Sequence, residues 1–533
     1  MFIETLTKKT FPILATLIFA SLTTTTLSHA VTIKNLDEIQ RALNTQSWTA
    51  LPLKKRVKIA ILDKGFYGYE YELGKSLPKD TKYFKGPVET PEDLKVEHGL
   101  AMAQIVTALM KKPDLYLYNA YGYSNLKASI EDLIAQKVDL VLYSEVWEFG
   151  GNRNGKGFIN ALVTQATEAG ITWVNAAGNF EQTSFTSAIE TLEDDWIKLP
   201  DQNHSLKVIC NSKDKCPLRA VLSWNDFKDD PEQGTDKDLD FALTDDFLNI
   251  LETSALKQTS DPKETRPGYS SYPRETIVKE LEPGTYFLRI KNRSDNFDEA
   301  DELFIAISGE GLTVPSHTPG QSLLNPADHP EVMTVGALDS ERSSYNRDLN
   351  KPNLLTLSTV KTPDGEFRGS SNSAAFVAGA LGLVKSRVPQ KDFAEILETS
   401  QLPGWSDNHR GISVYWLGFS APMGRCFRTY QAADLPQHLV DIVNLGGVLV
   451  ETTMGYRLMT PFDPIWVATN LNRYQPNDMI LATTEGFRLA PRNAPYTPAG
   501  WVEVFQTPQE LALCNPPRSP GNIFRLRAFS QSN

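Results

Sequence analysis

The stretch VKIAILD, residues 57–63, decides the fold of this chain, because it is a continuous apolar run that ends in an acidic residue. A short run without polar alternation is typical of a parallel strand that is buried on both faces. Further predicted elements follow in alternation: strands at 114–121, 138–144, 171–179 and 331–338, and helices at 100–111, 127–137, 158–169 and from 371 onward. This alternation predicts an α/β domain in which helices cover both faces of a parallel sheet.

Two parts of the chain depart from this alternation. Between 184 and 312 the sequence is rich in Asp, Lys, Ser and Thr, and its short alternating runs are separated by turn signals, which is typical of an antiparallel β unit. Since the α/β pattern returns afterwards, this unit is expected to be inserted in the α/β domain. We divide the chain into a leading segment (1–30), an α/β domain (31–183 and 313–419), a β-sandwich-like insert (184–312) and a mixed or β-rich C-terminal domain (420–533) to which the sequence assigns no chemistry.

The N-terminus has the pattern of a secretory signal peptide. Lys8 and Lys9 precede an apolar run over residues 11–20, and Ser28-His29-Ala30 has the small-x-small form of a cleavage site. The alternative is a membrane anchor, but the run is shorter than the about 20 residues that span a bilayer. We therefore expect a secreted or periplasmic protein that begins near Val31 and has no membrane span in its mature form.

Cysteine content and charge add two further expectations. An even count of four cysteines in an exported chain favours two disulfides, and proximity pairs Cys210 with Cys216 and Cys426 with Cys514. Free buried thiols are the alternative, and neither pair has the close spacing of a zinc site. The net charge of -12 argues against a nucleic-acid partner, because binding phosphates requires a basic face.

Four polar residues stand where predicted strands end or predicted helices begin. Asp63 and Asn179 end strands, whereas His98 and Ser371 open helices. Singly, each has an ordinary structural interpretation as a turn, cap or buried polar residue. Together they supply the orienting acid, the base, the oxyanion donor and the nucleophile that the hydrolysis of an amide needs.

The local motifs around these residues resemble those of the subtilisin-like serine peptidases. The motifs are IAILDKG (59–65), EHGLAMAQIV (97–106), NAAGN (175–179) and GSSNSAAFVAGA (369–380), with support from LLNPADHPEVMTVGALD (323–339) and KPNLL (351–355). The resemblance covers roughly 31–182 and 313–400. It implies a seven-stranded parallel α/β core and endopeptidase activity on a protein or peptide substrate, with Asp63, His98 and Ser371 as the catalytic triad and Asn179 in the oxyanion hole.

The chain departs from the family pattern at several positions. Lys64 replaces a small hydroxyl residue after the acid, and Ser370 replaces a threonine. The family's substrate strand usually reads Ser-Leu-Gly-Gly and forms one wall of the cleft. Here the substrate-binding candidates are Ser144, Glu145, Val146 and Trp147, together with Gly178.

Two expectations about specificity follow from these departures. Val146 and Trp147 stand at glycine positions, so the cleft wall should be bulkier than usual. Glu145 and Glu148 add negative charge, so Lys or Arg should be preferred near the scissile bond.

Three alternatives stay open at the level of sequence. The chain could be a pseudopeptidase that binds proteins without turnover, because its substrate strand and serine loop have diverged. It could belong to the related acid-active serine-glutamate-aspartate peptidases, with Glu97 as the glutamate, although the EHG motif argues against this. No cofactor is expected for hydrolysis itself. The insert weakly resembles β-sandwich domains of secreted peptidases, and it could hold calcium or simply carry an exposed acidic loop. The candidate calcium ligands are Asp226, Asp236, Asp238 and Asp240.

Overall fold

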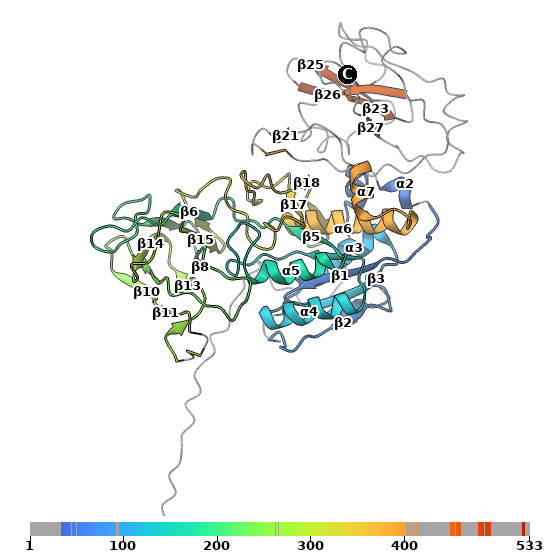
Figure 1. Ribbon diagram of the computed structural model, residues 1–533. Coiled ribbons are helices and arrows are strands. Elements are labelled where there is room, and N and C mark those ends of the chain that lie inside the picture. The colour runs from blue at the N-terminus through green and yellow to red at the C-terminus, as the bar shows by residue number, and fades with distance from the viewer. Residues whose placement is uncertain are drawn as a thin grey trace, which may run out of the picture.

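The computed structural model describes residues 33–400, apart from positions 44, 50, 92–94, 262 and 265, and beyond residue 400 only short strands between 406 and 527 (Figure 1). The predicted signal peptide, Cys426 and Cys514 therefore lie outside the described residues. Within the described part of the chain, no helix combines the length and the apolarity that crossing a membrane requires.

A seven-stranded sheet forms the centre of the α/β domain, and every strand pair in it is parallel. In spatial order its strands are β18 (Leu354–Thr356), β17 (Met333–Ala337), β5 (Thr172–Ala176), β4 (Leu140–Tyr143), β1 (Lys58–Asp63), β3 (Asp114–Asn119) and β2 (Lys82–Phe84). The predicted sheet is confirmed. Because β3 and β4 lie on opposite sides of β1, the strand order reverses there, and the carboxyl end of β1 borders the crevice where such sheets bind ligands.

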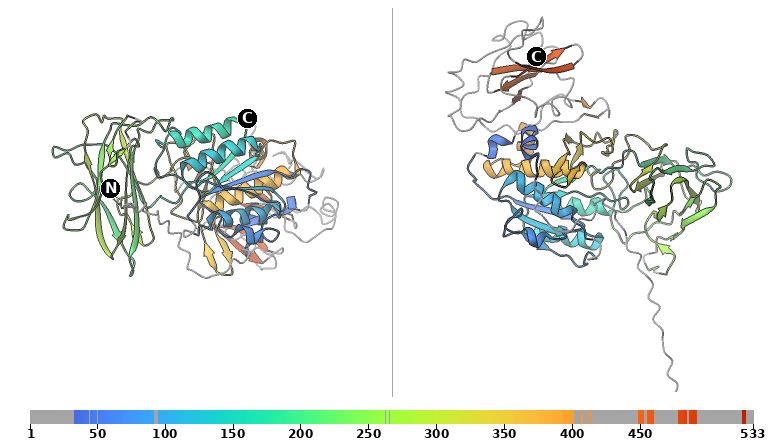
Figure 2. Two further views of the ribbon diagram at one scale, coloured as in Figure 1. Left: turned by 90° about the horizontal axis from the view of Figure 1, so that it is seen from below. Right: turned by 180° about the vertical axis from the view of Figure 1, so that it is seen from behind.

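Helices cover both faces of this sheet (Figure 2, left). Ile59 and Ile61 of β1 pack into the apolar cluster that includes α3 (His98–Met110) and α6 (Ser370–Arg387). Their neighbours Ala60 and Leu62 pack into the opposite cluster, which includes α4 (Tyr123–Ala135) and α5 (Phe158–Glu168). The run VKIAILD has no polar alternation because both of its faces are buried.

Helix α6 lies in the core and has almost no exposed residue. Its small residues allow this position: a Cβ added to Gly379 would lie 3.0 Å from Cβ of Leu109 in α3, and one added to Gly382 would lie 2.6 Å from Cδ1 of Ile59. A helix that is apolar on all sides must be buried on all sides. The sequence therefore fixes α6 between α3 and the sheet.

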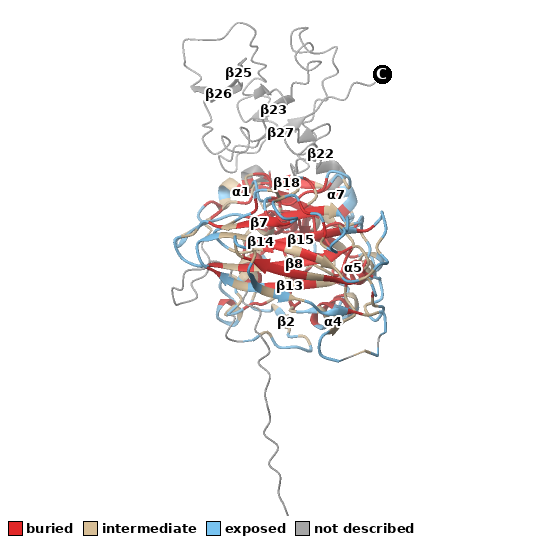
Figure 3. Cartoon of the chain, turned by 90° about the vertical axis from the view of Figure 1, so that its left-hand side faces the viewer, coloured by how far each residue is buried: buried red, intermediate tan, exposed pale blue. Residues whose placement is uncertain are grey.

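Two antiparallel sheets occupy the region from Ser184 to Thr313, beside the α/β domain (Figure 2). One contains β10 (Ile250–Ser254), β9 (Leu239–Thr244), β14 (Gly284–Asn292), β7 (Leu206–Cys210) and β16 (Leu312–Thr313), and the other contains β13 (Arg274–Leu281), β8 (Cys216–Trp224), β15 (Glu302–Ser308) and β6 (Ser184–Ala188). A separate apolar core includes buried residues of both sheets, as Figure 3 shows along β8 and β15. A disulfide between Cys210 and Cys216 joins β7 to β8 across the two sheets.

The remaining elements are short and flank these two units. They are α1 (Leu36–Ala42), α2 (Gln46–Thr49), the 3₁₀ turn η1 (Tyr69–Glu72), β11 (Lys257–Gln258), β12 (Tyr269–Ser270), β19 (Val360–Thr362), β20 (Gly365–Phe367), α7 (Phe393–Ser400), β21 (Ser406–Asp407), β22 (Ile412–Ser413), β23 (Val448–Thr452), β24 (Gly455–Met459), β25 (Asp478–Thr483), β26 (Gly486–Pro491) and β27 (Arg525–Arg527). The described strands beyond 400 pair antiparallel.

Candidate active site

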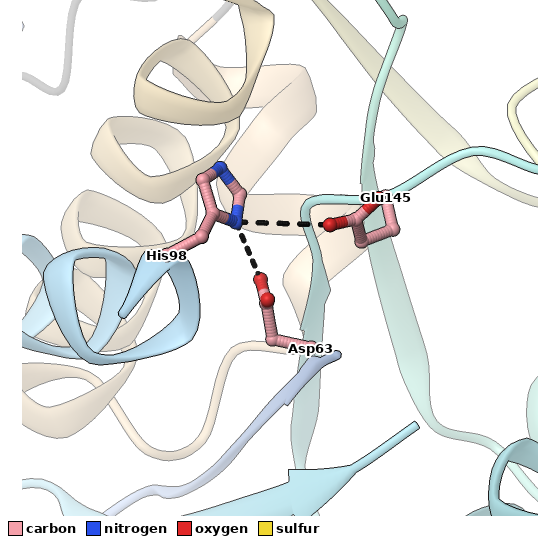
Figure 4. Close-up of side chains that lie close together, drawn as sticks. All are labelled: Asp63, His98 and Glu145. Atoms are coloured by element: carbon pink, nitrogen blue, oxygen red, sulfur yellow. Dashed lines mark hydrogen bonds and ion pairs between the residues drawn. The ribbon is translucent and has the colours of Figure 1, made fainter. Parts of the chain in front are cut away.

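A buried carboxylate and an imidazole meet where β1 ends and α3 begins (Figure 4). Asp63 is the last residue of β1 and has no exposed surface, and His98 is the first residue of α3. Nδ1 of His98 lies 2.7 Å from Oδ2 of Asp63, and the backbone N–H of Lys64 donates to Oδ1 at 2.9 Å. The Asp63 carboxylate therefore fixes the ring with the Nδ1 proton facing it, which leaves Nε2 for other partners.

The glycine after His98 makes this approach possible. A Cβ added to Gly99 would lie 2.6 Å from Cβ of Asp63 and 2.7 Å from the carbonyl oxygen of Gly65. Contacts this short are essentially absent from real structures, and one of them is with backbone that cannot turn away. The His-Gly pair is thus required for the start of α3 to pack against the end of β1.

A second carboxylate faces the same ring nitrogen. Glu145 follows β4, and its Oε1 lies 3.9 Å from Nδ1 of His98. Its Oε2 accepts a hydrogen bond from Nζ of Lys64 at 2.6 Å. Two residues that the sequence marks as separate departures from the family pattern therefore form one ion pair beside the imidazole.

The surrounding charges change the protonation of His98. Burial on its own lowers the pKa of the imidazole, but the charge and hydrogen bond of Asp63 and the charge of Glu145 outweigh it, and Lys64 opposes them only in part. The net effect raises the pKa of His98 from 6.5 to about 9. The ring is therefore an imidazolium at neutral pH.

Ser371 lies in the first turn of α6 and is half-buried. Its hydroxyl donates a hydrogen bond to the carbonyl oxygen of Ser144 at 3.1 Å. Across the described residues, none of the hydrogen bonds joins Ser371 to His98. An imidazolium has no acceptor atom, so a hydroxyl that donates elsewhere agrees with the protonation of His98 at neutral pH.

Asn179 lies at the same end of α6. Its Oδ1 accepts from the backbone N–H of Ser370 at 3.2 Å, which leaves the side-chain NH₂ group to donate to a ligand. The hydroxyl of Ser370 also binds the backbone of Gly178, the residue before Asn179, so this strand end and the start of α6 are tied together.

The side chains of Val146 and Trp147, which stand at the glycine positions of the family, both contact neighbouring residues. Val146 packs against a buried cluster that includes Ala177 and Leu323, and its Cγ2 would lie 3.3 Å from a Cβ on Gly178. The indole N–H of Trp147 donates to the Tyr143 hydroxyl at 2.6 Å, and its backbone N–H donates to Asn325 at 2.8 Å. Val146 therefore narrows the space beside Gly178, whereas Trp147 is held by its own domain.

The predicted preference for Lys or Arg rests on the negative charge of Glu145 and Glu148, and it stays a prediction that the pairing of these carboxylates does not favour. Glu145 is paired with Lys64, and Glu148 lies 3.4 Å from Nε of Arg219 in β8 of the insert. Each carboxylate already has a cation beside it, so neither offers a full negative charge to a substrate. The Arg219 contact also shows that the insert holds the segment that follows the substrate strand.

Metal ligands can be considered at two places. Asp63, His98 and Glu145 form a group whose potential ligand atoms lie within 4.8 Å of one another, but Asp63 and Glu145 are engaged by His98 and Lys64.

Among the described residues, the four aspartates of the insert do not form such a group. Their partners are Lys228 for Asp226, Asn296 for Asp236 and Arg293 for Asp240, while Oδ1 of the buried Asp238 has no partner in the described structure. Calcium binding stays a prediction that this geometry does not favour.

Glu97, the residue of the acid-active alternative, is exposed immediately before α3. In the described part of the chain its carboxylate has no hydrogen bond to Ser371 or His98. The arrangement pairs His98 with Asp63 instead, as the subtilisin-like resemblance predicts.

Comparison with known sequences identifies the family of this chain. The sequence model of the Subtilase family matches residues 54–403, which is well over half of the chain. The chain therefore belongs to the subtilase family and is a serine-type peptidase. None of the curated proteins matches its sequence.

Several solved structures of proteases are distantly similar. The CspB protease of Clostridium perfringens is 12% identical, with a TM-score of 0.42, over 72% of this chain and 94% of that chain. The nisin leader peptidase NisP of Lactococcus lactis is 14% identical, with a TM-score of 0.33, over 72% of this chain and 93% of that chain. The epidermin leader peptide processing serine protease EpiP of Staphylococcus aureus is 13% identical, with a TM-score of 0.35, over 74% of this chain and 80% of that chain.

Proposed function

We propose that this subtilase is an exported endopeptidase in which Ser371 is the nucleophile, His98 the general base and Asp63 the residue that orients His98. The observation that carries the proposal is the 2.7 Å contact between Nδ1 of His98 and the fully buried carboxylate of Asp63. This contact selects the ring tautomer whose Nε2 can accept a proton. The helix that begins with His98 packs against α6, which carries Ser371 in its first turn.

The reaction begins when His98 is neutral. The Ser371 hydroxyl then exchanges the Ser144 carbonyl for Nε2 of His98, gives up its proton and attacks the substrate carbonyl. The imidazolium that forms is stabilised by Asp63 and returns its proton to the leaving amine, and water then cleaves the acyl-enzyme by the same route.

The oxyanion of the tetrahedral intermediate has two candidate donors. The backbone N–H of Ser371 lies in the first turn of α6, where helix N–H groups lack intrahelical partners, and it has none elsewhere among the described residues. The side-chain NH₂ of Asn179 lies at the same helix end. Both donors act together with the positive end of the helix dipole on the charge that develops in the transition state.

The geometry of Val146 and Gly178 suggests which substrates fit. Since Val146 Cγ2 lies within contact distance of the Cβ position of Gly178, little room is left between the two segments. We propose that the subsite there accepts small side chains such as Ala, Ser or Gly. Shape, instead of charge, would then select the peptide bond.

Export is proposed from the sequence of residues 1–30. The disulfide between Cys210 and Cys216 supports it, because such bonds persist in oxidising compartments outside the cytoplasm. The predicted signal peptide itself would be tested by determining the N-terminus of the protein recovered from its native host.

A pseudopeptidase is the second candidate, and one observation favours it. The Ser371 hydroxyl is bonded to Ser144 and has no hydrogen bond to the imidazole in the described structure. Labelling with a fluorophosphonate probe at pH 7 and pH 10, followed by peptide mapping, separates the two. We expect modification of Ser371 that is faster at pH 10 and absent from Ser371→Ala. No labelling at either pH would establish the pseudopeptidase.

A further inference from the structure

We propose that Lys64 and Glu145 act as a pair of positioning residues that set the pH range in which His98 serves as a base. Glu145 gives the imidazole a second carboxylate, and Lys64 holds that carboxylate and cancels part of its charge. This inference rests on the role proposed above for His98, but it concerns two residues that the family pattern does not supply.

The contacts join one fully buried side chain and three partly buried ones. One ring atom, Nδ1 of His98, lies 2.7 Å from Asp63 and 3.9 Å from Glu145, while the other oxygen of Glu145 lies 2.6 Å from Nζ of Lys64. The exposed fractions of the side chains are 0% for Asp63, 19% for Glu145, 30% for Lys64 and 32% for His98. Charges this close in partly buried side chains are screened less by water than those of a fully exposed salt bridge.

The other elements around His98 add little charge. The first turn of α6 contributes only Ser370, Ser371, Asn372 and Ser373, and the basic residues of that helix lie in its last turn. On β4, Tyr143 is buried with its hydroxyl bonded to Trp147, and Glu148 beyond it is paired with Arg219. Glu97, on the residue before α3, is exposed. Within the part of the chain that the structure describes, the charged groups other than Asp63 that act on the imidazole are therefore Glu145 and Lys64.

The two residues depend on each other. Glu145 without Lys64 would place a second negative charge beside Asp63 and hold the imidazolium more tightly. Lys64 without Glu145 would place an unpaired positive charge beside His98 and lower the pKa of the imidazole. Glu145 raises the pKa of His98 and Lys64 lowers it. The ion pair therefore makes His98 a stronger base than Asp63 alone would, and the ring can still lose its proton at alkaline pH. A stronger base accepts the Ser371 proton more readily. The His98 ring is then neutral, and able to act as a base, only under alkaline conditions.

The test uses the full-length protein with Ser371→Ala, in which the ring can be titrated without turnover or self-cleavage. The carbon resonances of labelled histidine give the midpoint for His98, identified by its loss in a His98→Gln variant. We expect Glu145→Gln to lower the midpoint by about one pH unit and Lys64→Met to raise it by a similar amount, since each removes one charge near the ring. The double variant should return close to the starting midpoint.

Matched controls separate this effect from general damage. Glu148→Gln removes the neighbouring carboxylate, which does not face the ring, and should leave the midpoint unchanged; Lys64→Arg keeps the charge and should do the same. Shifts in the same direction for Glu145→Gln and Lys64→Met, or no shift in either, would overturn the proposal. Because the titration does not depend on activity, opposite shifts in a protein without peptidase activity would reject the proposed function while supporting the role of the pair.

Discussion

Ser370 binds both backbone polar groups of Gly178: its hydroxyl accepts a hydrogen bond from the Gly178 N–H and donates one to the Gly178 carbonyl oxygen, each at 3.0 Å. This double contact joins the segment that carries Asn179 to the first turn of α6, which carries Ser371. The candidate oxyanion donor and the candidate nucleophile are therefore held in register by a residue that takes no part in the chemistry.

Ser370→Ala should weaken this register without removing a catalytic group. The loss leaves the buried backbone N–H of Gly178 without its partner, whereas the Gly178 carbonyl oxygen keeps the hydrogen bond from the backbone N–H of Ser344 at 2.9 Å. We therefore expect a loss of about 1–3 kcal/mol in the free energy of unfolding and a fall in kcat with little change in KM. Ser370→Thr, which keeps a hydroxyl and gives the residue that the family has at this position, should leave both values close to those of the native protein. A Thr variant as impaired as the Ala variant would show that the hydroxyl contact is not the cause.

Asn179→Leu tests the oxyanion donor. The side chain should contact charge that develops only in the transition state, so we expect kcat to fall roughly 100- to 1000-fold with little change in KM. Steady-state kinetics on one peptide substrate measure both constants. An unchanged kcat would mean that the match of Ala-Ala-Gly-Asn to the family motif is accidental.

The pKa of His98, raised to about 9, predicts an alkaline enzyme. The neutral ring is the base, so kcat/KM should rise with pH and level off only above about pH 9. The same pKa shift makes the stability of the folded state fall as the pH rises. The folded state binds this proton more tightly than the unfolded chain does. The stabilisation is therefore complete below about pH 6.5 and is lost as the pH rises through about 9. A pH profile of kcat/KM that reaches its plateau near pH 7 would contradict the account of the site.

Val146→Gly should widen the subsite beside Gly178. Removing the Val146 side chain, whose Cγ2 lies near this glycine, gives room for a larger substrate side chain. A change of a single methylene in an apolar pocket already alters selectivity by roughly 10- to 200-fold. Profiling a peptide library should show small residues preferred by the native protein and Leu or Phe accepted by the variant. Val146→Ala should lie between them, and a profile that is identical in all three would place this subsite elsewhere.

Much of the fold could be predicted from sequence because the buried strands and α6 are apolar in an unbroken pattern. VKIAILD and the small-residue run of α6 admit few other structures. Other elements carry no such pattern: β2 has only three residues at the edge of the sheet, and α4 begins at Tyr123, before the predicted 127, because Tyr123 packs edge-on against Phe158 of the neighbouring helix.

The candidate site divides in the same way. Asp63, His98, Asn179 and Ser371 could be named from local motifs, each of which is contiguous in the chain. The Lys64–Glu145 pair could not, because its members are 81 positions apart and meet only when β1 and β4 lie side by side. The prediction of a basic substrate preference could not take the partners of Glu145 and Glu148 into account either, because these partners are set by tertiary contacts.

The central claim is that Ser371 and His98 act as one catalytic unit, and turnover of a peptide substrate at pH 10 by the two single alanine variants and the double variant tests it most directly. Residues that share one mechanism do not lose activity additively. We predict that Ser371→Ala and His98→Ala each lower kcat by several orders of magnitude and that the double variant is hardly worse than either. A double variant that loses the product of the two single losses, or a Ser371→Ala variant that keeps its activity, would contradict the account.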